Sequence, residues 1–484
     1  MPSSIRPPFA RTISPLLLAT TLCASVAAPV LAAEGGPETP AIVEVESVLP
    51  PALPWDGASR SLAVEPDSED PWITPSERSG LRASPDYGTT MAWLRRLVVS
   101  TADLHMVSLG KSGEGRDIWM VIASSSQAFS PEKVRASRKP VVLAQAGIHS
   151  GEIDGKDAGL MLLRDMTVRG TKRHLLDHVE WLFVPILNVD GHERRSAHGR
   201  INQRGPEVMG WRTTARNLNL NRDFAKADSP EMQALLRALG TWEPDLLVDL
   251  HVTDGIDYQY DITWGYGGPQ STSPTISTWL ETVLDPPVQK KLEAMGHVPG
   301  YLVFGLDGQN PDNALFHWSA ADPRFSDGYG AWRHLPTILV ENHSLDPYDR
   351  RVLGTYVLLE GILETVGREA ASLHAATAAD RARRPKSVAT SWTVDRQAPP
   401  ERVAFAGVAW KHEDSEISGR QKVVWLGTPE QKQLPRFLPT VPVGEVELPE
   451  AYWVPAPWTE VIERLALHGV RYEMVEEEIG RAHV

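Results

Sequence analysis

The stretch KPVVLAQAGIHSGEIDGKDAG, residues 139–159, decides the fold and the chemistry of this chain. Its apolar run 141–146 predicts a buried strand, which breaks at Gly147 and delivers His149 and Glu152 on one tight loop. An imidazole nitrogen and a carboxylate oxygen at this spacing can bind the same divalent ion, and this donor pair suits Zn²⁺. Because His-x-x-Glu also arises by chance, two surface polar residues are the alternative interpretation of this motif alone.

The composition is that of a globular protein with a sizeable core. The chain has 484 residues, of which 42% are hydrophobic, which allows one large domain with smaller additions. Its formal net charge is −14 at pH 7. We therefore expect no general nucleic-acid-binding or anionic-membrane surface.

The first 32 residues predict a cleaved secretory signal peptide. They combine Arg6 and Arg11, no acid, an apolar run over 16–28 and a small-residue end, Val-Leu-Ala. The apolar run is too short to span a bilayer, so we expect a secreted or periplasmic protein with no membrane span in its mature form. The single cysteine, Cys23, lies in this segment, so a metal in the mature protein would be held by His, Asp or Glu.

Changes in composition divide the rest of the chain into four parts. Residues 33–85 are rich in proline and acids, and we expect a loosely packed segment with little regular structure. Residues 86–370 alternate buried strands with helices and predict an α/β domain: a mixed, mostly parallel open sheet flanked by helices. Residues 371–400 are expected to be a linker, and residues 401–484 a β-rich accessory region with strands near 403–410, 422–427 and 451–455 and a helix at 459–468. The last seven residues, EIGRAHV, resemble a translated sequencing adapter, so we expect the natural chain to continue.

Polar side chains with chemical potential follow several of the predicted strands. The three further apolar runs are 181–187 before Asn188, 245–250 before His251, and 337–340 before Glu341. In an open α/β sheet, ligands bind at the carboxyl ends of the strands. His149 and these three residues are therefore expected at one edge of the sheet, where His251 can serve as a third metal ligand.

Five motifs follow one another in order along the chain. They are Gly147-x-His149-x-x-Glu152, NVDG at 188–191, WRTTARNLNLNRDF at 211–224, Leu250-His251, and LVENHS at 339–344. Over roughly residues 89–367 this ordered set resembles the zinc carboxypeptidase family, of the carboxypeptidase A and B type. The resemblance implies one Zn²⁺ per chain, held by His149, Glu152 and His251. Three protein ligands leave a fourth position for water, as in catalytic zinc sites.

The resemblance also implies that Glu341 is the general base. A carboxylate beside a cation can accept a proton from water and later deliver it to the leaving amine. The alternative is a strand-end carboxylate that pairs with Arg350 or Arg351.

Two further positions match family residues that contact the substrate. Arg212 corresponds to the residue that polarises the scissile carbonyl, and Asn221 with Arg222 to the pair that holds the C-terminal carboxylate. The alternative for Arg212 is a solvated loop arginine, since Arg204 and Arg216 lie nearby in the sequence.

Three positions depart from the family pattern or match it loosely. Asn219 stands where the family often has an acid that orients a zinc-bound histidine. Tyr329 is the nearest candidate for the substrate-capping tyrosine, and a structural aromatic is the alternative. Asp327 lies in the segment that lines the specificity pocket of relatives, where it would favour C-terminal Lys or Arg, unless it is an ordinary turn residue.

The sequence predicts a zinc-dependent metallocarboxypeptidase, secreted or periplasmic, that acts on peptides with a free C-terminal carboxylate. A first alternative is a zinc amidase or deacylase that acts on N-acyl amino acids or cell-wall peptides. A second alternative is an inactive homologue that binds peptides without cleaving them.

Overall fold

Strand β3 (Val141–Ala146) lies near the middle of an eight-stranded sheet in a computed structural model, which describes residues 48–268, 273–319 and 322–475. The strand order is β1-β2-β4-β3-β5-β10-β6-β7. The other strands are β1 (Leu104–Lys111), β2 (Asp117–Ala123), β4 (Glu180–Val184), β5 (Leu246–Val252), β6 (Ile262–Gly265), β7 (Pro299–Tyr301) and β10 (Thr337–Asn342). Strands β4, β3, β5 and β10 run parallel, and the β1–β2, β2–β4 and β10–β6 pairs are antiparallel. The predicted mixed α/β sheet is confirmed.

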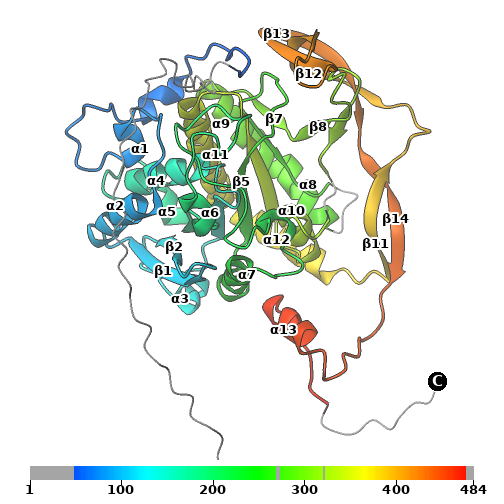
Figure 1. Cartoon of the computed structure of the whole chain (residues 1–484). Helices are drawn as coiled ribbons and strands as arrows, with labels where there is room; N and C mark the ends of the chain where they lie inside the picture. Colours follow the sequence, from blue (N-terminus) through cyan, green and yellow to red (C-terminus); the bar gives the residue numbers. More distant parts are fainter. Residues whose placement is uncertain (1–47, 269–272, 320–321, 476–484) are drawn as a thin grey trace, which may run out of the picture. The chain divides into compact units, whose positions relative to one another are not determined.

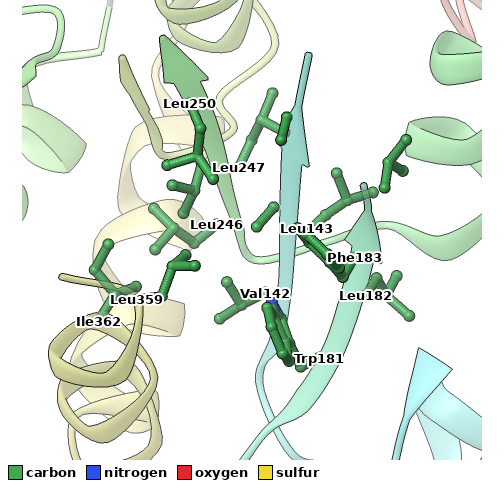
Figure 2. Close-up of a cluster of buried hydrophobic side chains, with 14 of the residues drawn as sticks. Val142, Leu143, Trp181, Leu182, Phe183, Leu246, Leu247, Leu250, Leu359 and Ile362 are labelled. Carbon is green, nitrogen blue, oxygen red and sulfur yellow. The ribbon is translucent and has the colours of Figure 1, made fainter. Parts of the chain in front are cut away.

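The central strands are covered on both faces, which explains their continuous apolar runs. Every residue of β3, β4 and β5 is buried. Parallel strands packed between two layers lose the alternation of polar and apolar residues that half-exposed strands show. In Figure 2, Leu359 and Ile362 of α11 (Tyr348–Arg368) lie on one side of the strand that carries Leu246 and Leu250.

Helix α4 (Asp154–Met166) packs unusually close to the sheet through two glycines four residues apart. A Cβ atom on Gly159 would lie 2.2 Å from the ring of Phe183, and one on Gly155 would lie 2.5 Å from Leu250. Residues four apart share one face of a helix, so both glycines face the sheet. Because α4 begins two residues after Glu152, this close packing also fixes the loop that carries Glu152.

Helices alternate with the strands of the main domain. Helix α2 (Tyr87–Val99) precedes the β1–β2 hairpin, and Ser229 caps α7 (Pro230–Trp242) by accepting a hydrogen bond from the Met232 amide. Helix α11 packs against α4 and α9 (Figure 1). The remaining helices are α3 (Pro131–Ser137), α5 (Leu175–His178), α6 (Val189–Glu193), η3 (Leu220–Arg222), α8 (Pro274–Trp279), η4 (Leu280–Leu284), α9 (Asp285–Ala294), α10 (Ser326–Trp332) and α12 (Ala370–Ala382).

The N-terminal segment from residue 48 to 85 is packed on the domain, contrary to the expectation of loose packing. Its regular structure is limited to η2 (Ala58–Leu62) and α1 (Pro75–Arg78). However, Glu77 is fully buried and forms an ion pair of 2.5 Å with Arg164 of α4. A buried carboxylate needs such a partner, and composition alone does not reveal that a distant arginine supplies it. The predicted signal peptide and the final seven residues lie outside the described residues.

The β-rich region shares a sheet with the main domain. Strands β12 (Glu401–Asp414) and β13 (Gln421–Phe437) form a hairpin, and β13 continues onto β9 (Leu315–His317) and β8 (Val303–Gly305). The expected linker contains α12 and β11 (Ser387–Val394), which pairs with β14 (Pro439–Glu447). Helix α13 (Thr459–Leu467) matches the expectation, whereas residues 451–455 form no strand. Among the described residues, no helix is long and apolar enough to cross a membrane.

Candidate metal centre and active site

Three residues predicted to hold a metal converge at one edge of the sheet. His149 and Glu152 lie on the loop between β3 and α4, and His251 lies near the end of the adjacent strand β5. One ligand atom from each residue lies within 4.8 Å of the others, and all three side chains are buried. Glu152 is further held by the Val252 amide, which donates to Oε2 at 3.1 Å.

Hydrogen bonds orient both imidazoles so that Nδ1 faces Glu152. His149 Nδ1 lies 3.0 Å from Glu152 Oε1, and His251 Nδ1 lies 2.9 Å from Oε2. The Nε2 atoms lie 2.9 Å from Asn219 Oδ1 and 3.0 Å from Asp249 Oδ2. If each Nε2 donates its proton to that oxygen, both Nδ1 atoms become acceptors that face a carboxylate. Only a proton or a cation can sit among three acceptors, so these residues fit a bound Zn²⁺.

The pKa values of the two histidines shift in opposite directions. Burial lowers the pKa of His149, so this imidazole tends to be neutral, as a metal ligand must be. Burial also acts to lower the pKa of His251, but Asp249 and Glu152 outweigh it and raise the pKa well above its ordinary value. His251 therefore has to release a proton when a metal binds.

Two arginines share the Glu152 carboxylate. Arg200 Nη1 donates to Oε1 at 2.6 Å, and Arg212 Nη1 reaches the same oxygen at 3.2 Å. Arg212 is therefore at the site, although its role toward substrate stays a prediction. Of its sequence alternatives, Arg204 donates to the backbone oxygen of Leu345 instead.

Sequence reasoning missed two residues of this centre. Arg200 lies in a long polar loop without any motif, so no local signal identifies it. Asp249 had a usable signal, because it precedes His251 by two residues on a strand, and residues at that spacing share one face. Gln145 on β3 donates to Asp249 Oδ1 at 2.9 Å and so holds this carboxylate toward His251.

Glu341 lies beside the predicted metal ligands and is not paired with the arginines that follow it. It is the register partner of His251 in the parallel β5–β10 pair. Arg350 instead pairs with Asp346 and Asp261, and Arg351 with Asp154. Glu341 Oε2 is buried without a hydrogen-bond partner. Burial raises the pKa of Glu341 to about 8, and the charge of Glu152 adds to this effect.

Asn188 organises the loop that carries Arg212. The NVDG stretch forms the short helix α6, and the Asn188 side chain caps it by accepting from the Gly191 amide at 3.0 Å. Asn188 Nδ2 also donates to the Arg212 backbone oxygen at 3.3 Å. Asn188 therefore positions a loop and is not a ligand.

Asn221 and Arg222 lie together on η3. Arg222 is exposed, and its guanidinium lies 4.4 Å from the ring centre of Phe325. Asn221 is buried, and its Oδ1 has no hydrogen-bond partner. Partial desolvation of the guanidinium lowers the pKa of Arg222, and so does the neighbouring charge of Arg212. A second cation close to the first makes this corner attractive to an anion.

Tyr329 and Asp327 are both engaged inside the protein. The Tyr329 hydroxyl lies 3.0 Å from His468 Nδ1, beyond the end of α13, and its ring packs near Phe224. Asp327 is buried and accepts a hydrogen bond of 2.7 Å from Trp318 Nε1. Burial raises the pKa of Asp327 to about 6. These contacts favour structural roles, and substrate capping by Tyr329 stays a prediction.

Asn219 makes a testable contribution to metal affinity. Its Oδ1 is the acceptor for His149 Nε2, the position at which relatives often carry an acid. We expect Asn219→Ala to weaken zinc binding by about 10-fold to 100-fold, the usual cost of losing such a partner, and Asn219→Asp to retain or strengthen it. Competition with a chromophoric chelator measures both. Equal affinities for the wild type and Asn219→Ala would contradict this role.

Comparison with known proteins finds similarity to metallocarboxypeptidases over part of the chain. Residues 90–275 match the model of the zinc carboxypeptidase family. The inactive metallocarboxypeptidase ecm14 of Schizosaccharomyces pombe is 34% identical over 116 residues, which are 23% of this chain and 23% of that protein.

Solved metallocarboxypeptidases are similar at lower identity. The metallo-carboxypeptidase from Burkholderia cenocepacia shares 18% identity over 58% of this chain and 69% of its own, with a TM-score of 0.41. The carboxypeptidase A from Helicoverpa armigera shares 19% identity over 61% of this chain and 74% of its own, with a TM-score of 0.43.

Proposed function

We propose that this protein, whose residues 90–275 match the model of the zinc carboxypeptidase family, is a zinc-dependent metallocarboxypeptidase that removes C-terminal residues from peptides. One observation carries the proposal: beside the buried His149, Glu152 and His251 cluster lies the Glu341 carboxylate, whose Oε2 has no hydrogen-bond partner among the described residues. The proposal includes export, for which the basic and apolar first 32 residues are the support.

His149, Glu152 and His251 would hold the Zn²⁺, which supplies Lewis acidity and makes water a stronger acid. Glu341 accepts the proton of the attacking water and later delivers it to the leaving amine. Its position on β10 beside His251 places it next to the ligands, and its raised pKa favours a group that both accepts and donates protons near neutral pH.

Arg212 and Arg222 are assigned to two different negative charges of the substrate. Arg212 contacts Glu152, and in this proposal it stabilises the oxyanion that develops on the scissile carbonyl. Arg222, with Asn221, binds the terminal carboxylate of the substrate. The solvent-exposed Arg222 guanidinium is fixed beside Asn221, because its Nη1 donates to the Asn221 backbone oxygen at 2.6 Å. The Asn221 group that can donate to a carboxylate is its Nδ2 amide.

The carboxylate clamp is tested by Arg222→Ala. We expect kcat/KM for a blocked dipeptide with a free C-terminus to fall by about 100-fold, because a charge-assisted pair to the carboxylate is lost. The matched control is Arg216→Ala, an exposed arginine of the same loop, which should behave as the wild type.

The same test separates the two alternatives. Unchanged kcat/KM in Arg222→Ala would contradict recognition of a terminal carboxylate by Arg222, and would favour an amidase whose substrates are bound without that contact. The relative from Schizosaccharomyces pombe is described as inactive. An absence of turnover for any peptide by wild-type protein with one zinc per chain would likewise favour a peptide-binding role here.

A further inference from the structure

A cavity of about 390 Å³ opens beside the proposed catalytic base. Glu341 lines it, together with Thr253 and Asp254, which lie two and three residues after His251 in the chain. Its walls also include residues of β8 and of the loop after it. The opposite wall comes from the C-terminal region, because Val423 and Trp425 of β13 line the same cavity. A segment more than 80 residues beyond Glu341 in the sequence thus reaches the site.

The β12–β13 hairpin is anchored firmly enough to define this wall. Phe405 and Leu434 pack with Tyr258, Val303 and Leu315 in a separate small core.

Polar contacts add to this core. The Gln259 amide donates to the Ala406 oxygen at 2.8 Å, Lys432 Nζ lies 2.8 Å from Asp312, and His412 Nε2 lies 2.7 Å from the Gln309 oxygen. The hairpin is thus fixed to the segment before β6 and to the loop after β8.

The cavity lies away from the residues proposed to hold the terminal carboxylate. Neither Asn221 nor Arg222 is among its lining residues, whereas Glu341 is. The reacting bond lies next to Glu341, with the terminal residue held by Asn221 and Arg222. The cavity therefore faces the part of the substrate that precedes the scissile bond.

The lining of the cavity combines acids with apolar walls. Asp254, Asp307 and Glu341 are its charged residues, and no lysine or arginine lines it. Asp307 is fixed in place, since its Oδ1 accepts the amides of Gln309 and Asn310.

The nearest cation to these acids is already engaged. Arg200 reaches Asp254 at 3.2 Å, but it also pairs with Glu152 at 2.6 Å. The side chain of Asp254 is 79% exposed and open to a ligand.

A lysine or arginine side chain matches this arrangement. Its aliphatic stem can lie against Ile256, Phe304 and Trp425, and its cation can reach Asp254 and Asp307. The aromatic faces of Phe304 and Trp425 add an attraction for a cation. An acidic side chain would meet like charges.

We propose that the β12–β13 hairpin completes a binding site for a basic side chain upstream of the scissile bond. Asp254, Asp307 and Trp425 would determine this specificity. The inference rests on the proposed carboxypeptidase function and names its substrate class: peptides with Lys or Arg just before the residue that is removed.

Three peptides test this preference: acetyl-Lys-Lys-Phe, acetyl-Nle-Nle-Phe and acetyl-Glu-Glu-Phe. All release phenylalanine, so the terminal residue is constant. We expect the wild type to cleave the lysine peptide with a kcat/KM about tenfold above that of the glutamate peptide. Asp254→Asn combined with Asp307→Asn should bring the two values together. Trp425→Ala should lower kcat/KM for the lysine and norleucine peptides.

The control variant is Asp395→Asn, because Asp395 accepts turn amides as Asp307 does but lies outside the cavity lining. It should keep the wild-type ratio. A ratio that persists in the double variant, or a preference for glutamate, would overturn the inference, while release of phenylalanine would still support the proposed function.

A binding measurement distinguishes failure of the proposed function from failure of the cavity assignment. Calorimetry with zinc-loaded Glu341→Gln measures the affinity for the uncleaved peptides. Suppose that the wild type cleaves none of the peptides, yet binding is selective for the lysine peptide and this selectivity is lost in the Asp254 and Asp307 variants. The proposed function then fails and the cavity assignment holds. Equal affinities for all three peptides would overturn the cavity assignment.

Discussion

Glu341→Gln is expected to lower kcat for C-terminal hydrolysis by about 10³-fold while one zinc per chain is retained. Glutamine keeps the size of the side chain but cannot accept the proton of water or return it to an amine, and proton transfer of this kind contributes about 10²-fold to 10⁴-fold. The substitution also leaves the ligands His149, Glu152 and His251 unchanged.

The measurement pairs steady-state hydrolysis of a blocked dipeptide with zinc content by mass spectrometry. The matched control is Glu243→Gln, a surface carboxylate with a side chain 63% exposed, which should behave as the wild type. Activity within about tenfold of the wild type for Glu341→Gln, at full zinc content, would contradict the assignment of the base.

The pH dependence should follow the ionised form of Glu341. The carboxylate is the active base, so kcat/KM rises as pH increases through its pKa. Burial raises this pKa to about 8, and a nearby divalent cation would lower it. We therefore expect the acid limb of the kcat/KM profile below pH 8, and an increase in activity with pH across that limb.

The site residues at the strand ends were predictable because each follows an apolar run that the sequence itself marks as a buried strand. Continuous apolar runs mark β3, β5 and β10, and each delivers a functional residue at the same edge. His149, Glu152, His251 and Glu341 could thus be placed near one another from pattern alone, and the structure brings them together.

Other features depend on contacts between distant segments and leave no local pattern. Helix α11 is buried on nearly all sides, so its apolar residues show no single stripe, and its polar residues are paired, as Arg351 is with Asp154. Arg200 and Trp425 likewise reach the site from loops or strands far away in sequence. Only the folded chain reveals them.

His149→Ala is expected to abolish stoichiometric zinc binding. Loss of a residue that only hydrogen-bonds a ligand, such as Asn219, lowers metal affinity by up to roughly 100-fold, and loss of the ligand itself should lower it well beyond that. The variant removes one of three donor atoms that lie within 4.8 Å of one another. The matched control, His198→Ala, removes an exposed histidine of the following loop and should bind one zinc per chain. A His149→Ala protein that is folded by circular dichroism and still holds one zinc after dialysis would show that the ligand assignment is wrong.

Protons released on zinc binding give an independent measure of the same centre. His251, whose pKa is raised, must lose a proton to bind the metal, and Glu341 is largely protonated at pH 7 before the cation arrives. A nearby cation stabilises the ionised carboxylate, so the wild type should release about one proton more than Glu341→Gln, in which this position cannot titrate. Calorimetry at pH 7 in buffers of different ionisation enthalpy measures the difference. Because deprotonation and binding are coupled, zinc affinity of the wild type should rise with pH across the range in which His251 and Glu341 lose their protons.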